Sequence, residues 1–452
     1  FVNPILASSQ ADQDISMLVY SGLLRALPDG SFALDLAESY AVSQDDTVYT
    51  FVLREGATFH DGTPVSAADV LYTIALAQNP DVKSPRRADW EGVAVSSPDS
   101  RTIVFTLPHA YAPFIENATL GILPKHLWDK TPAADLPFST LNTHPVGTGP
   151  FEISDVKTDG TGAVTRYDLA PFKDFALGRP HLSRITFLFF ANDEALLKAY
   201  GAETVNAIAG LAPADLPRVE GASAQLVATP LPRVFGIFFN EGKNAALADG
   251  AVRAALDAAL DRQTIIGSAL GGFGTALDGP IPPGILDDAT PVFPIPLPAT
   301  STPITHAQDK TENARAILRR GGWSWDEKRE AWTKKKETLS LKLATADSPE
   351  LVATAEAAAA AWRRVGVAVS LQVYPLSEFN NTILRPRDYE AILFGEVVGR
   401  NADLFAFWHS SQRNDPGLNL ALYANTKTDA LLTRARAESS PRVRAALYRQ
   451  FA

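Results

Sequence analysis

Apolar and polar residues alternate with a period of two in two early stretches of the chain. Residues 48–53 and 102–107 carry β-branched and aromatic side chains at alternate positions, which is the pattern of strands with one buried face. Turn sequences at 28–30 and 60–62 interrupt this region. Residues 20–107 are therefore expected to be rich in strands.

A change of period marks one helix between these strands. Val70 and Ile74 recur at helical spacing. Ser66, followed three residues later by Asp69, forms a capping-box sequence. Pro80 would block continuation of the helix, so the pattern predicts a short helix between Ser66 and Pro80.

The second half of the chain alternates strand and helix patterns. Apolar strand patterns lie at 339–343, 367–374 and 390–394. Between the first two, an alanine-rich helix has Pro349 in its first turn and Gly366 at its end. A strand, a helix and a strand in this order predict a parallel crossover, so this half belongs to the α/β class.

Three further segments complete the pattern in this half. The apolar run at 233–240 lacks alternation and predicts a strand covered on both faces. A helix is expected at 252–260 and another at 377–384. Residues 280–303 are rich in proline, and we expect an ordered loop or an exposed arm there.

A loop is expected after Phe394, and geometry makes it a candidate ligand site. Ligands of open α/β sheets bind beyond the carboxyl ends of the strands. Residues 395–403 concentrate two acids, one guanidinium and one amide. These side chains belong to Glu396, Arg400, Asn401 and Asp403.

Composition narrows the classes of function. At 452 residues the chain is long enough for two or three folding units. Its formal charge of −10 opposes binding to nucleic acid or to anionic lipid. The chain has no cysteine, which excludes disulfides and thiolate chemistry, and no apolar run reaches the ~18 residues that span a bilayer.

Candidate catalytic and cofactor chemistry is sparse. The seven histidines are scattered without the spacing of a metal site, so neither a metal nor another cofactor is expected. No Gly-x-Ser-x-Gly motif occurs, which favours a non-enzymatic protein. The glycine-rich residues 146–151 lack the lysine of a phosphate loop and predict a tight turn that leads into a strand.

A set of short segments is informative because of its order along the chain. The segments are LVYSGL at 18–23, LAESY at 36–40, YTFVLR at 49–54, FHDGTPV at 59–65, VGTGPF at 146–151, FN at 239–240, VRAAL at 252–256 and DR at 261–262. Taken together, they resemble the family 5 bacterial extracellular solute-binding proteins, the dipeptide- and oligopeptide-binding components of ABC transporters.

The resemblance implies a two-lobed α/β clamshell of the periplasmic-binding-protein type (type II, large cluster). Lobe I would comprise 1–28 and 145–233, and 29–144 would form an inserted strand-rich subdomain. Residues 234–452 would form lobe II and a C-terminal helix. A leader is expected to have preceded the first residue, and a final family strand that returns to lobe I is expected beyond the last.

The resemblance also implies how a ligand is held. The lobes would close about a solute, most simply a peptide, whose backbone pairs with one extended segment of the protein. The family's tryptophan after Gly395 is absent here, so either acid of 395–403 would receive an ammonium, and the arginine a carboxylate. The implied ligand-binding residues are Tyr20, Ser21, Gly22, Phe235, Asn240, Glu396, Arg400, Asn401, Asp403 and Trp408.

Partners and location follow from the same resemblance. The chain would deliver its solute to the permease subunits of an ABC importer, act as a monomer and work outside the cytoplasm, in the periplasm or on the outer face of the membrane. The open alternatives are a sensing module for another solute, such as a nickel complex, a sugar or an opine, and a peptide or glycoside hydrolase. Tyr20 and Phe235 fit core packing as well as they fit ligand contact.

Overall fold

The computed structural model describes residues 2–28, 30–219, 225–227, 233–281, 305–398, 403–415 and 417–452. The chain divides into two compact units. Unit 1 comprises Phe1–Ala209 with Arg436–Pro441, and unit 2 comprises Gly210–Ala435 with Arg442–Ala452. The chain therefore passes from unit 1 to unit 2 for the first time between residues 209 and 210. The boundary at 233 and the separate subdomain at 29–144 stay predictions.

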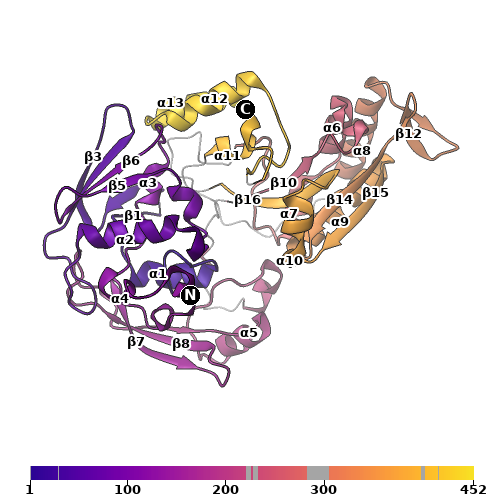
Figure 1. Ribbon diagram of the computed structural model, residues 1–452. Coiled ribbons are helices and arrows are strands. Elements are labelled where there is room, and N and C mark those ends of the chain that lie inside the picture. Colours follow the sequence, from indigo (N-terminus) through magenta and orange to yellow (C-terminus); the bar gives the residue numbers. More distant parts are fainter. Residues whose placement is uncertain are drawn as a thin grey trace. The chain divides into compact units, whose positions relative to one another are not determined.

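Unit 1 is built on antiparallel sheets, in the orders β3-β4-β6-β5, β7-β8-β9 and β1-β2 (Figure 1). Its strands are β1 (Leu24–Ala26), β2 (Phe32–Leu34), β3 (Ala37–Val42), β4 (Val48–Leu53), β5 (Ala94–Ser96), β6 (Thr102–Thr106), β7 (Phe151–Thr158), β8 (Val164–Pro171) and β9 (Ile185–Leu188). Its helices are α1 (Gln10–Val19), α2 (Ala67–Gln78), α3 (Phe114–Asn117), α4 (Lys125–Trp128) and α5 (Asp193–Gly201).

The period-two pattern at 48–53 produces the core of this unit. Alternate side chains of β4 are buried, among them Phe51, and its ring meets Phe105 of β6 edge-on with the centroids 5.8 Å apart. Phe105 in turn contacts Trp90 and Phe114, and both of these are fully buried. The strand-rich prediction for this region is confirmed.

Helix α2 begins as the sequence predicts, at a capping box formed by Ser66 and Asp69. The Asp69 carboxylate accepts the Ser66 backbone N–H at 2.9 Å and the Ser66 hydroxyl at 2.8 Å. Its second oxygen accepts the backbone N–H of Lys125 at 3.0 Å. The capping acid therefore also holds the start of α4.

Unit 2 centres on a mixed sheet of order β10-β16-β14-β15, with a small sheet of order β11-β12-β13 beside it (Figure 1). Its strands are β10 (Arg233–Phe239), β11 (Ser324–Asp326), β12 (Ala331–Lys334), β13 (Glu337–Thr338), β14 (Ser340–Ala346), β15 (Ala368–Tyr374) and β16 (Ala391–Val397). Its helices are α6 (Gly250–Ala258), α7 (Arg262–Ala269), α8 (Thr305–Arg320), α9 (Pro349–Val365), α10 (Leu376–Phe379), α11 (Leu404–Trp408) and α13 (Pro441–Phe451), and α12 (Thr426–Ala437) ends in unit 1.

The predicted crossover is confirmed. Strands β14 and β15 pair in parallel, and helix α9 connects them. The helix ends at Gly366, whose φ of 104° lies in the left-handed region. A Cβ there would lie 2.5 Å from the Trp325 ring, so packing as well as backbone conformation requires glycine.

Two predictions for this unit need correction. Strand β10 was expected to be covered on both faces, but it lies at the edge of its sheet and leaves Phe235 45% exposed. An unbroken apolar run does not distinguish a buried strand from an edge strand with an exposed end. The helix expected at 377–384 divides into α10 and a π-helical turn at Asn380–Leu384.

The remaining proline-rich prediction falls mostly on residues 282–303, which lie outside the described residues. None of the helices in the described ranges combines the length and the apolar character needed to cross a membrane.

Candidate functional site

The first candidate region is the extended segment Tyr20, Ser21 and Gly22 in unit 1, directly after helix α1. The helix begins at a full capping box between Ser9 and Asp12. It ends at Tyr20, whose backbone N–H donates to the Ser16 carbonyl at 2.8 Å. The position of the segment is therefore fixed by the end of helix α1.

Most backbone groups of this segment are already bonded within unit 1. The Ser21 N–H donates to the Thr148 hydroxyl at 3.1 Å, and the Ser21 carbonyl accepts the Ile122 N–H at 3.0 Å. The Gly22 carbonyl accepts the Leu36 N–H at 3.1 Å. Among the described residues, nothing bonds the Tyr20 carbonyl or the Gly22 N–H. These two groups are what the segment can offer to an extended ligand.

The Tyr20 side chain is a core residue. Its side chain packs closely on two glycines: an added Cβ at Gly121 would lie 2.7 Å from the Tyr20 Cβ, and one at Gly147 would lie 3.0 Å from the Tyr20 ring. Burial raises the pKa of its hydroxyl far above the ordinary value. Any ligand contact by this residue therefore passes through its backbone.

Asp35 lies behind the same segment, and sequence reasoning missed it. Its carboxyl is buried, which raises its pKa, while a hydrogen bond from Ser21 and the charges of Arg25 and Arg54 act in the opposite direction. The sequence feature that could have indicated a buried acid is its place between two leucines, with an arginine in the strand region on either side. One oxygen of the Asp35 carboxyl, Oδ1, has no hydrogen-bond partner among the described residues.

The second candidate region is the end of the large sheet in unit 2 where the parallel strands terminate, called its carboxyl edge. Strand β10 runs antiparallel to β16, so that Phe235 pairs with Gly395 and Val234 pairs with Glu396. The Phe235 ring lies across Gly395, where an added Cβ would be 2.7 Å from the ring. Val397 follows on the same face and is 60% exposed.

Other strands of this sheet end at the same edge. The parallel strands β14, β15 and β16 all have their carboxyl ends there, and β10 has its start. Val373 at the end of β15 and Leu376 just beyond it are 44% and 54% exposed. The carboxyl edge is where open α/β sheets bind ligands, and here it exposes apolar side chains.

Glu396 lies inside β16, so the loop predicted from residue 395 onward was wrong in its first part. Pairing with β10 continues through Val397, which lies opposite Arg233, and the Phe235 ring covers Gly395. Glu396 is 9% exposed, and its Oε1 has no hydrogen-bond partner among the described residues. Burial raises its pKa to about 8, against the lowering effect of Arg387.

Arg387 does not pair with Glu396 directly. Its guanidinium donates to the carbonyls of Leu384, Arg413 and Gly417, and these bonds fix it in the interior. A buried carboxyl with an unbonded oxygen lowers the stability of the fold unless another group forms a hydrogen bond or ion pair with that oxygen. A cationic or hydrogen-bond-donating group of a ligand would supply the missing partner.

The structure separates some of the other predicted site residues from this edge. Asn240 follows the far end of β10 from Phe235, and its side-chain amide donates to the Arg387 carbonyl at 3.1 Å. Trp408 packs against Phe238, Tyr423 and Phe451 as part of the core.

The remaining predicted side chains follow β16. Asp403 directly precedes α11, and its carbonyl accepts the Ala406 N–H at 3.2 Å. Arg400 and Asn401 lie outside the described residues. The site therefore stays a prediction whose described part is the edge around Phe235 and Glu396.

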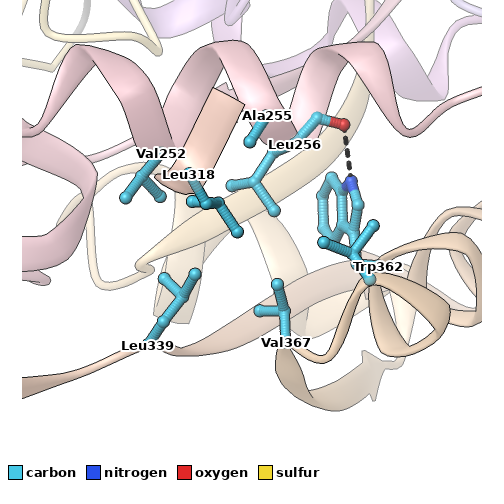
Figure 2. A pocket seen from close by; sticks show the side chains of 8 residues that line it. Val252, Ala255, Leu256, Leu318, Leu339, Trp362 and Val367 are labelled. Atoms are coloured by element: carbon cyan, nitrogen blue, oxygen red, sulfur yellow. Dashed lines mark hydrogen bonds between the residues drawn. The ribbon is translucent and has the colours of Figure 1, made fainter. Parts of the chain in front are cut away.

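A small cavity inside unit 2 is not a ligand site. Figure 2 shows side chains from α6, α8 and α9 converging with Leu339 and Val367. The lining residues are almost wholly buried, and the one polar group drawn, the Trp362 indole N–H, donates to the Leu256 carbonyl at 2.8 Å. This cavity belongs to the hydrophobic core.

No group of three or more metal-binding side chains comes together in the part of the chain that the structure describes.

Comparison with known proteins places these features in a family. The sequence profile described as "Bacterial extracellular solute-binding proteins, family 5 Middle" matches residues 31–417. The oligopeptide-binding protein AppA of Bacillus subtilis is 26% identical over 448 residues, which cover 97% of this chain and 78% of that protein. The dipeptide-binding protein of Escherichia coli is 26% identical over 483 residues, covering 99% and 84%.

A solved structure gives the same result for the fold. The structure of AppA from Bacillus subtilis in complex with a nonapeptide superposes with a TM-score of 0.71 at 25% identity. The match covers 99% of this chain and 87% of that one. The α/β fold predicted from the sequence resemblance is confirmed.

Proposed function

We propose a transport role from the premise that the chain belongs to the bacterial extracellular solute-binding proteins of family 5. The protein captures a small solute, releases it chemically unaltered, and delivers it to the permease subunits of an ABC importer. The solute is a peptide. The protein acts as a monomer outside the cytoplasm, without catalysis.

One observation carries this proposal. Glu396 is a buried carboxyl with an unbonded oxygen near the carboxyl ends of the parallel strands, and Phe235 exposes its ring on the opposite face of the same sheet. An ammonium group would complete the carboxyl, and an apolar side chain would cover the ring. A peptide supplies both groups in one molecule.

The chemistry of unit 1 supports the same solute. The Tyr20 carbonyl is an acceptor and the Gly22 N–H is a donor, two residues apart on one extended segment. A peptide backbone carries a donor and an acceptor on every residue, so it can pair with such a segment whatever its side chains. The names of the two curated relatives, an oligopeptide-binding and a dipeptide-binding protein, agree with this choice.

Native mass spectrometry of the protein with an equimolar pool of synthetic di- to nonapeptides tests the proposal. We expect intact peptides to be retained in a one-to-one complex. Cleaved products would indicate a hydrolase instead, and retention of a nickel complex, a sugar or an opine in place of peptides would indicate another transported or sensed solute. Any of these outcomes would contradict peptide binding without catalysis.

Substitutions locate the site. Glu396→Gln should weaken peptide binding by about 1.5–3 kcal/mol, the range for a hydrogen bond to a charged group. Glu378→Gln removes an exposed acid from α10 and serves as the matched control. Phe235→Ala should also weaken binding, whereas Phe138→Ala, at a ring that is 85% exposed in unit 1, should not. Equal affinities across all four variants would remove the unit 2 edge from the site.

A further inference from the structure

His60 makes an unusual set of hydrogen bonds to one turn of unit 1. Its backbone N–H donates to the Gly147 carbonyl at 2.8 Å. The Gly147 N–H reaches the ring Nδ1 at 3.2 Å, and the ring Nε2 lies 3.1 Å from the Gly149 carbonyl. One residue thus holds both ends of the turn at 147–149 through three bonds.

The opposite side of this turn holds the candidate ligand segment. The Gly149 N–H donates to the Val19 carbonyl at 2.8 Å, and the Thr148 hydroxyl accepts the Ser21 N–H at 3.1 Å. The turn has no room to move towards the helix. A Cβ on Gly147 would lie 2.0 Å from the Val19 carbonyl oxygen, and one on Gly149 would lie 2.5 Å from the Leu18 carbonyl oxygen.

The two ring contacts require one form of the imidazole. Nδ1 must be unprotonated to accept the Gly147 N–H, and Nε2 must carry a proton to donate to the Gly149 carbonyl. Burial lowers the pKa of His60 to about 4, and the hydrogen bond to Gly149 and the charge of Asp61 oppose this only in part. The Phe172 ring packs edge-on against the imidazole, with the centroids 4.8 Å apart.

We propose that His60 is a positioning residue for ligand binding, whose neutral imidazole holds the 147–149 turn and, through it, the segment from Val19 to Gly22. The inference rests on the proposed function, because the ligand contact of that segment does. The sequence presents His60 only as part of an Asp-Gly turn, and the Gly62 N–H does donate to the Phe59 carbonyl at 2.9 Å. The ring contacts are additional to that turn.

Two substitutions each remove one of the two ring contacts and retain the other. His60→Asn retains a polar atom near the position of Nδ1 and loses the contact to the Gly149 carbonyl. His60→Gln retains a donor near the position of Nε2 and loses the partner of the Gly147 N–H. His181→Asn, at an exposed histidine of the same unit, is the matched control.

Amide hydrogen exchange on the full chain measures the positioning without a ligand. We expect each His60 variant to speed exchange at Ser21 and Gly149 about fivefold, the effect of one lost hydrogen bond, and the control to leave it unchanged. Ring ¹⁵N spectra of the wild type at pH 7 should show Nε2 protonated and Nδ1 unprotonated. Unchanged exchange in both variants, or a proton on Nδ1, would overturn the inference.

Retention of the peptide pool by native mass spectrometry then connects the positioning to binding. We expect both variants to retain less peptide than the wild type and the control, by about the same factor as the exchange. Faster exchange with unchanged retention would overturn the role in binding. A wild type that retains no peptide would refute the proposed function instead, and exchange alone would then decide whether His60 positions the segment.

Discussion

The two candidate regions differ in how far the surrounding protein encloses them. In unit 1, the segment at 20–22 is enclosed by glycine backbone and hydrogen-bonded on nearly every side. In unit 2, the sheet edge exposes the ring of Phe235 and leaves an oxygen of buried Glu396 without a partner among the described residues. Both regions contain buried atoms without a hydrogen-bond partner among the described residues, the Tyr20 hydroxyl and one Asp35 oxygen in the first and one Glu396 oxygen in the second. They differ in enclosure, because glycine backbone surrounds the first region and the second exposes an aromatic ring.

This difference suggests a division of roles. A rigid segment that offers one carbonyl and one N–H can pair with any peptide backbone, so it contributes affinity without choosing a sequence. An exposed ring and an unpaired carboxyl respond to particular groups, so they contribute selectivity. Substitutions in unit 1 should therefore lower stability and overall affinity, and substitutions in unit 2 should change which ligands are chosen.

Gly147→Ala should give the largest effect on stability. Its Cβ would lie 2.0 Å from the Val19 carbonyl oxygen, and backbone on both sides cannot move away. We expect a loss of about 4 kcal/mol or more in the free energy of unfolding, at the upper end for single substitutions. Urea unfolding measures it, with Gly160→Ala as the control because no atom lies within 4 Å of a Cβ there. Similar values for both variants would show that the turn is not tightly enclosed.

The second-largest effect should be the dependence of the stability of unit 2 on pH. Folding raises the pKa of Glu396 to about 8, so the folded state retains a proton that the unfolded state releases above about pH 4.5. The free energy of unfolding should therefore fall by about 4 kcal/mol as the pH rises from 4.5 to 8. Glu396→Gln should remove this part of the dependence. Parallel curves for the variant and the wild type would contradict the burial of an unpaired carboxyl.

Unit 1 should show a smaller dependence of the opposite sign. The pKa of His60 is lowered to about 4 in the folded state, so the unfolded state binds a proton first as the pH falls below 6.5. Unfolding free energy should decrease by about 2 kcal/mol between pH 6.5 and 4. His60→Asn should flatten this interval, whereas His181→Asn should not. Hydrogen exchange at β7 and β14, which reports the two units separately, is the suitable measurement.

Gly395→Ala should give the smallest loss of stability. Its Cβ would lie 2.7 Å from Phe235, but that neighbour is a side chain with an exposed ring that can turn away. We expect less than about 1 kcal/mol in urea unfolding, together with a change in which peptides the protein retains. A loss as large as that of Gly147→Ala would contradict the contrast between the two regions.

The sequence predicted the regular parts of the fold well. The alternation at 48–53, the capping residues of α2 and the strand, helix and strand around α9 depend on local patterns, and the structure confirms them. The pattern did not reveal that β16 continues through Glu396, because a charged residue after glycine resembles a loop. The continuation depends on pairing with β10, more than 150 residues away in sequence.

Prediction of the candidate site was limited for the same reason. The edge could be located because ligands follow the carboxyl ends of parallel strands. Sequence did not indicate that Asn240 would bond the Arg387 carbonyl, or that the half-buried Trp408 would pack against the core, since both depend on tertiary contacts. Asp35 was missed because it belongs to no recognisable motif, and the role of His60 was missed because its segment at 59–65 indicates only a turn, whereas its ring bonds residues distant in sequence.

Proton release on ligand binding tests most directly whether a ligand completes the unit 2 edge. Titration calorimetry at pH 7 in phosphate and in Tris, with the most strongly retained peptide of the pool, measures it. Because the pKa of Glu396 is about 8, the carboxyl is mostly protonated before binding, and an ammonium partner should release close to one proton. We expect this release in the wild type and not in Glu396→Gln. Binding without proton release, or equal release in both proteins, would contradict the claim.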